Sequence, residues 1–134
     1  MFNLVDTVKQ VIETKSDGRV AVIRAYLCGN SGEGFWLQDD SDRISEKRVL
    51  ISHRDFHQIF EPQFEIAAGG QLDYMFEAIA EGVIEHINSP TGDVALERIA
   101  RLQVCDAGFF EEVVLDLDKA REVGEKKFYR PSIE

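Results

Sequence analysis

One stretch decides the fold of this chain: Leu72-Asp-Tyr-Met-Phe-Glu-Ala-Ile-Ala-Glu-Gly-Val-Ile-Glu-His-Ile87. Its apolar residues recur at the three- and four-residue spacing of an amphipathic helix. In such a helix Glu77, Glu81 and Glu85 share one solvated face, where like charges one turn apart destabilise each other. A helix here would make the protein an α+β fold with residues 72–87 helical.

The same stretch also has the two-residue alternation of a β-strand. One face of that strand is lined by Tyr74, Phe76, Ala78 and Ala80, and Gly82 marks a bulge where the alternation shifts. A turn at 88–93 follows, and after it comes a second alternating run at 94–104. Because this context is typical of consecutive strands, the sequence favours the strand over the helix.

Three earlier segments have the same strand character. They run over 19–28, 34–39 and 47–52, and turn-rich sequence separates them. Apolar spacing predicts flanking helices at 3–14, where a first β-strand is the competing interpretation, and at 107–123. Ser52 is the expected N-cap of a shorter helix that ends at Pro62. The sequence therefore predicts a mostly β fold with flanking helices.

In this order the segments resemble the oligonucleotide/oligosaccharide-binding (OB) fold. The resemblance is carried by Asp17-Gly-Arg-Val-Ala-Val-Ile-Arg-Ala-Tyr-Leu27, Gly34-Phe-Trp-Leu-Gln-Asp39, Ala80-Glu-Gly-Val-Ile-Glu85 and Ala95-Leu-Glu-Arg-Ile-Ala-Arg-Leu-Gln-Val104. It implies a five-stranded barrel over about residues 17–104, with a helix between its third and fourth strands. Ala25 is a departure, because the first strand of this fold often has glycine there.

Length and composition bound the class of protein. The 134 residues fit a single domain, 1–134. No apolar run reaches the roughly 20 residues that cross a bilayer, and the first residues lack the basic region of a signal peptide. We therefore expect a cytoplasmic protein that does not bind membranes, with Cys28 and Cys105 reduced.

The net charge of −10 is unevenly distributed. Residues 61–104 hold two basic and eight acidic groups, whereas residues 1–28 hold four basic and three acidic groups. Such a surface repels phosphate backbones and attracts basic proteins. The leading hypothesis is therefore a non-catalytic module that recognises a basic protein, as an inhibitor or immunity-type protein does. The acidic surface is expected around Glu77, Glu81, Glu85 and Glu97.

The alternative is single-stranded nucleic-acid binding, which the OB resemblance implies through aromatic residues and a basic groove. The residues expected to carry it are Tyr26, Trp36, Arg24 and Arg48. Alternation puts Phe35 and Trp36 on opposite faces of their strand, so either one of them lies away from the core or both are packed by different neighbours.

Catalytic and metal motifs are missing from the sequence. It has no Gly-x-Ser-x-Gly motif, no Walker loop and no HExxH motif. His53 and His57 have helical spacing with Glu61 one turn further, but no third histidine is near, so we interpret them as solvated helix residues. We expect no enzyme activity, no cofactor and no metal.

Overall fold

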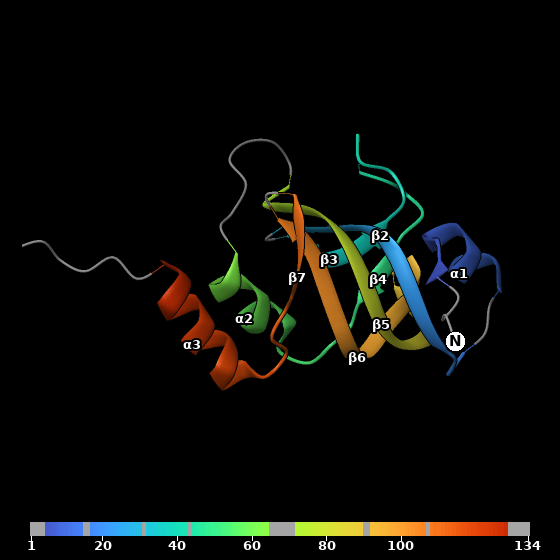
Figure 1. Ribbon diagram of the computed structural model, residues 1–134. Coiled ribbons are helices and arrows are strands. Elements are labelled where there is room, and N and C mark those ends of the chain that lie inside the picture. Colours follow the sequence, from blue (N-terminus) through green and yellow to red (C-terminus); the bar gives the residue numbers. More distant parts are fainter. Residues whose placement is uncertain are drawn as a thin grey trace, which may run out of the picture.

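The stretch that decides the fold is a strand. In the structure, a computed structural model, β5 spans Tyr74–Ser89, which confirms the strand and rules out the α+β alternative with residues 72–87 helical. The structure describes residues 5–14, 17–30, 32–42, 44–64, 72–89, 92–106 and 108–128. The protein is mostly β with short helices, as the sequence predicts (Figure 1).

Five strands form a ring. They are β2 (Val20–Asn30), β3 (Gly34–Gln38), β4 (Val49–Ile51), β5 and β6 (Gly92–Asp106). Their order around the ring is β2, β3, β4, β6 and β5, and β5 pairs back onto β2 along Val20–Gly29. The β4–β6 pair is parallel and the other four are antiparallel. The ring is uneven, because β4 contributes only two residue pairs on each side.

Two short strands extend the sheet outside the ring. The first, β1 (Val5–Asp6), pairs in parallel with the start of β2. The last, β7 (Phe109–Glu112), pairs antiparallel with the end of β6. Long strands leave edges that such short segments can cover, because backbone N–H and C=O groups need partners.

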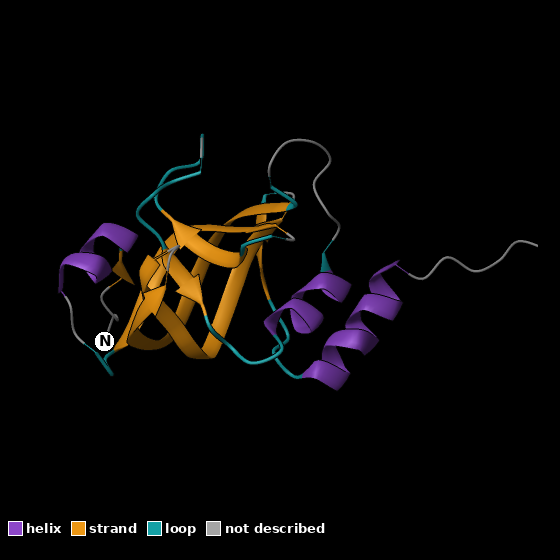
Figure 2. Cartoon of the chain, turned by 180° about the vertical axis from the view of Figure 1, so that it is seen from behind, coloured by secondary structure: helices purple, strands orange, loops and turns teal. Residues whose placement is uncertain are grey.

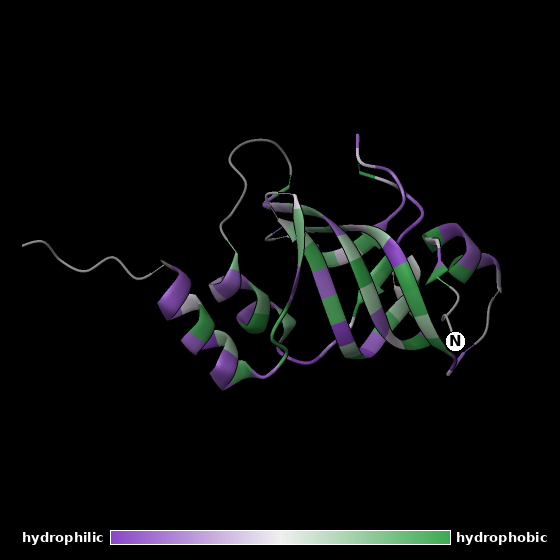
Figure 3. Cartoon of the chain, viewed as in Figure 1, coloured by the Kyte–Doolittle hydropathy of each residue, from purple (hydrophilic) through white to green (hydrophobic). Residues whose placement is uncertain are grey.

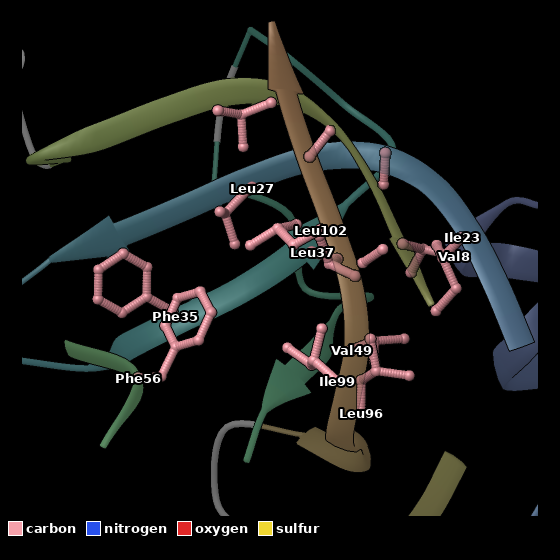
Figure 4. Close-up of a cluster of buried hydrophobic side chains, with 14 of the residues drawn as sticks. Val8, Ile23, Leu27, Phe35, Leu37, Val49, Phe56, Leu96, Ile99 and Leu102 are labelled. Carbon is pink, nitrogen blue, oxygen red and sulfur yellow. The ribbon is translucent and has the colours of Figure 1, made fainter. Parts of the chain in front are cut away.

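Alternation along the strands separates an inner face from an outer face. Apolar side chains at every second position point into the ring and pack against one another (Figure 4), among them Ile23, Leu27, Phe35, Leu37, Val49, Leu96 and Leu102. The strand alternation predicted for Tyr74, Ala78 and Ala80 is confirmed, since all three are buried in this core. The same alternation is visible as hydrophobic and hydrophilic bands along β5 and β6 (Figure 3).

The sequence predicts a bulge in β5 where the alternation shifts at Gly82, and this needs correction: Ala80 and Ile84 both enter the core, so the alternation of β5 continues, and the irregularity lies on the partner strand. The β5–β6 register shifts between Glu81, which pairs with Arg101, and Val83, which pairs with Glu97. The extra residues therefore lie on β6 opposite Gly82, and Arg98 there has a left-handed backbone with φ 44°. Gly82 is required because an added Cβ would lie 2.9 Å from the carbonyl oxygen of Glu97.

Helices lie at the two ends of the ring (Figure 2). At one end is α1 (Val8–Thr14), which contributes Val8 and Val11 to the core. At the other end are α2 (Phe56–Phe60), the 3₁₀ turn η1 (Glu61–Gln63) and α3 (Leu117–Phe128). The aromatic rings of α2 close that end, with the Phe35 and Phe56 ring centres 5.0 Å apart.

The predicted helix limits need correction. The N-terminal helix begins at Val8 rather than at residue 3, because residues 5–6 form β1; residues 3 and 4 lie outside the described part. The helix predicted at 107–123 is wrong over its first half. Residues 109–112 form β7, and α3 runs over 117–128, because the free edge of β6 supplies partners for the backbone of 109–112. Ser52 is not the cap of α2, since Asp55 precedes the helix in a left-handed conformation.

One buried side chain joins α3 to the rest of the molecule. The Gln63 side-chain amide donates to the carbonyl oxygens of Ile59 and Val114, each at 2.8 Å. Its Oε1 accepts the Val114 N–H at 3.0 Å. These bonds hold the segment before α3 against η1, so the position of α3 depends on a polar group inside the protein.

Candidate binding surfaces

The aromatic site predicted around Trp36 is closed. Trp36 lies on the outer face of β3 but is fully buried, and its Nε1–H donates to Oε1 of Gln38 at 2.9 Å. The same oxygen accepts the Ser45 N–H at 2.9 Å, so the segment after β3 folds back over this face. The interpretation in which Phe35 and Trp36 are both packed is confirmed. In this conformation the Trp36 ring has no exposed face on which a base could stack, and nucleic-acid binding through Trp36 stays a prediction.

Arg48 covers the Trp36 ring. Its guanidinium carbon lies 4.5 Å from the ring centre, the geometry of a cation–π contact. The guanidinium is also within 3.5 Å of the Glu33 carboxylate. Two of the four residues predicted for nucleic-acid binding therefore contact each other, with Arg48 covering Trp36.

The other two, Arg24 and Tyr26, lie on the outer face of β2. Arg24 donates to the Glu77 carboxylate through Nη2 at 2.6 Å and Nε at 3.2 Å. An open groove of about 420 Å³ lies here. It is lined by Arg24, Tyr26, Glu77, Thr7, Lys9, Ala25 and Asp39. Asp39 accepts the N–H groups of Val8 and Lys9, at 2.9 and 3.0 Å, and so caps α1. The groove therefore contains both charge signs rather than a basic surface.

The four predicted glutamates lie together on the outer face of β5 and β6. Glu77, Glu81 and Glu85 occupy outward positions of β5, and Glu97 lies on β6 opposite Val83. We call these four residues the glutamate face. Part of its charge is neutralised, since Glu77 pairs with Arg24 and Glu97 lies 3.4 Å from Nη2 of Arg98.

Glu81, a third member of the glutamate face, lies beside a hollow in the surface. It faces Arg101 across the β5–β6 pair. Both line a hollow of about 180 Å³ with Val22, Ile79 and Gln103. Arg101 in turn donates from Nε to Glu112 on β7 at 2.7 Å.

The end of the glutamate face at Glu85 and Glu97 has excess negative charge. A hydrogen bond between the two carboxyl groups, together with their mutual repulsion, raises the pKa of Glu85. Asp17 adds to this repulsion, and Arg98 opposes it. A positive group placed here would lower the free energy of the ionised carboxylates.

Two exposed aromatic residues were missed because a helix was predicted at 107–123. Phe109 and Phe110 on β7 are 78% and 41% exposed. Phe110 lies over the outer face, with the Arg24 guanidinium 5.8 Å from its ring centre. The alternation of Phe110 and Glu112 toward the outer face was the available signal, but the apolar residues from 109 onward fit helical spacing equally well.

The two histidines with helical spacing are not on one helix face. His53 precedes α2, and its Nδ1 accepts the Ile99 N–H at 2.9 Å. His57 lies in α2, 2.9 Å from the Glu61 carboxylate. Among the described residues no group of three or more His, Cys, Asp or Glu side chains is arranged to hold a metal. Cys28 and Cys105 are free thiols.

Comparisons with known proteins do not assign this chain to a family. A scan against protein-family models, a search of curated proteins and a search of solved structures each found no match to this chain. Within the described residues, no helix has the length and apolar character needed to cross a membrane.

Proposed function

We propose that this chain is a non-catalytic protein-recognition module built on an OB-like ring, and that its partner is a basic protein. The ring supports the OB-like topology because its fifth strand, β6, lies between the third and fourth, β4 and β5. The helix α2 follows the third strand of the series, where that fold places one. An inhibitor or immunity-type role fits a small acidic module of this kind.

The observation that carries the proposal is the close approach of the Glu85 and Glu97 carboxyl groups, whose repulsion Arg98 offsets only in part. These carboxyl groups lie close enough to raise the pKa of Glu85, so a partner's Lys or Arg side chain there would relieve their repulsion. The net charge of −10 would also speed the approach of a basic protein.

Apolar residues beside these glutamates support a protein partner over free cations. Val20 is 63% exposed and pairs across the sheet with Val83, which in turn pairs with Glu97. The line of neighbours Val20, Val83 and Glu97 across the sheet therefore combines apolar contact area with a charged side chain, as protein interfaces do. In Figure 1 the outer face of β5 and β6 is turned to the viewer, and none of the described helices lies over it.

The test compares two charge-matched double variants. Glu85→Gln/Glu97→Gln removes two charges from the glutamate face, and Glu13→Gln/Glu46→Gln removes two from exposed positions elsewhere. Immobilised proteins are exposed to lysate, and each retained protein is identified and its binding remeasured after purification. We expect a basic protein that wild type and the control pair retain and the Glu85/Glu97 variant releases. Retention of every partner by all three proteins would contradict the proposal.

Single-stranded nucleic acid remains the alternative function. Its test is Trp36 fluorescence during titration with an oligonucleotide at low and moderate salt, since Trp36 is the one tryptophan of the chain. Salt-sensitive quenching would favour this alternative over a basic protein partner.

A further inference from the structure

A buried cation lies outside the glutamate face. Arg48 directly precedes β4, and its side chain is only 10% exposed. Its guanidinium is stacked on the fully buried Trp36 ring, 4.5 Å from the ring centre. A charged group is rarely buried this far unless its hydrogen-bond donors find partners.

The donors of Arg48 are incompletely used. Nε and Nη1 are both buried and have no hydrogen-bond partner among the residues that the structure describes. The Glu33 carboxylate lies 3.5 Å from Nη1, which satisfies the distance of an ion pair but not the geometry of a hydrogen bond. A planar guanidinium matches two oxygens of a carboxylate or phosphate. An anion beside Nη1 that is better aligned than Glu33 would therefore use the Nη1 donor, which Glu33 leaves without a hydrogen bond.

Glu33 is placed to leave this position. It lies in the turn between β2 and β3, its side chain is 36% exposed, and Nδ2 of Asn30 donates to it at 3.3 Å. Rotation of the Glu33 side chain into solvent would vacate the position beside Nη1 without moving a strand. In this arrangement Glu33 is an internal competitor for any external anion.

We propose that Arg48 is the anion-binding residue of a small-ligand site, which takes a phosphate or carboxylate group and which Glu33 blocks in the free protein. The Trp36 ring forms one wall, and the anion replaces the Glu33 carboxylate on the guanidinium. This site is separate from the glutamate face, so the two proposals fail independently.

The experiment measures Trp36 fluorescence during titrations with inorganic phosphate and with acetate, against sodium chloride of equal ionic strength. Glu33→Gln removes the internal competitor, and Glu46→Gln makes the same charge change at an exposed position. We expect Glu33→Gln to bind one of the two anions at least tenfold more tightly than wild type, and Glu46→Gln to match wild type. The better anion identifies the source of the ligand group as a phosphate or a carboxylate.

Arg48→Lys provides the second arm, because lysine keeps the charge and loses the planar pair of donors. In the Glu33→Gln background it should weaken anion binding at least tenfold. Melting temperature, which should rise at lower anion concentration in Glu33→Gln than in wild type, provides a readout that is independent of fluorescence.

Three results would overturn the proposal. Equal responses of Glu33→Gln and Glu46→Gln would mean an adventitious ion only. No response to either anion in Glu33→Gln would mean that Arg48 is structural. Quenching by an oligonucleotide without any response to inorganic phosphate would assign this surface to nucleic acid instead.

Discussion

Replacing Gly82 by alanine tests whether the β5–β6 irregularity requires a residue without a side chain. A methyl carbon at Gly82 would lie 2.9 Å from the Glu97 carbonyl oxygen and 3.0 and 3.1 Å from Cγ and Cδ1 of Leu96. Carbon atoms in favourable contact stand about 3.5–4.0 Å apart. The carbonyl belongs to a strand backbone held by the Val83–Glu97 pair, so it cannot yield without disturbing the pairing.

The expected loss of stability follows from two opposing effects. Overpacking of a well-packed site costs roughly 1–3 kcal/mol. Removing a glycine from a strand interior returns about 0.5–1 kcal/mol, because the unfolded chain loses freedom. We expect a net loss of about 1–2 kcal/mol, which for a chain of this length lowers the melting temperature by about 4–7 °C.

Urea unfolding and thermal melts followed by circular dichroism measure this loss. The matched control is Gly32→Ala, because the nearest atom to its added methyl group, Oδ1 of Asn30, is 3.8 Å away. We expect the control to be as stable as wild type or slightly more stable. If Gly82→Ala is as stable as Gly32→Ala, the argument from close approach is wrong.

Three further predictions concern His53, Gln63 and Cys28. Stability should fall as pH drops below about 6.5, because burial lowers the pKa of His53 and protonation removes the acceptor of the Ile99 N–H. His53→Asn keeps an acceptor, so urea titrations should show a smaller loss of stability on acidification than in wild type. An identical loss in the two proteins would contradict this. Gln63→Leu should cost about 1–3 kcal/mol in urea unfolding, because both backbone groups of Val114 lose their partner, and unchanged stability would refute it. Burial raises the pKa of Cys28 to about 12, so iodoacetamide at pH 8 should leave it unmodified by mass spectrometry until urea is added; alkylation of the folded protein at the unfolded rate would disprove this.

Local patterns in the sequence predicted the strands. In β5 the alternation of apolar and polar residues sets which side chains enter the core, because successive side chains of a strand point to opposite faces. In the structure Glu77, Glu81 and Glu85 lie together on the outer face because this alternation continues through Gly82 instead of shifting there. Gly82 indicated the irregularity, although the extra residues lie on β6, which the sequence of β5 alone does not reveal.

Ambiguous patterns were resolved by neighbours that are distant in the sequence. Residues 109–112 fit a helix by spacing, but the edge of β6 supplied hydrogen-bond partners and made them a strand. Trp36 points outward by alternation, as the sequence predicts, yet it is buried because the segment carrying Ser45 and Arg48 folds over it.

The sequence by itself determined the five strands of the ring, their inner and outer faces and the shared location of the glutamates. Each of these depends on the geometry of one strand and its alternation. Only the tertiary structure decided which outer residues are accessible and which charges are neutralised. Three contacts show this: the burial of Trp36, the pairing of Arg24 with Glu77, and the incompletely used donors of Arg48. Each depends on segments that folding brings together, and no local pattern encodes it.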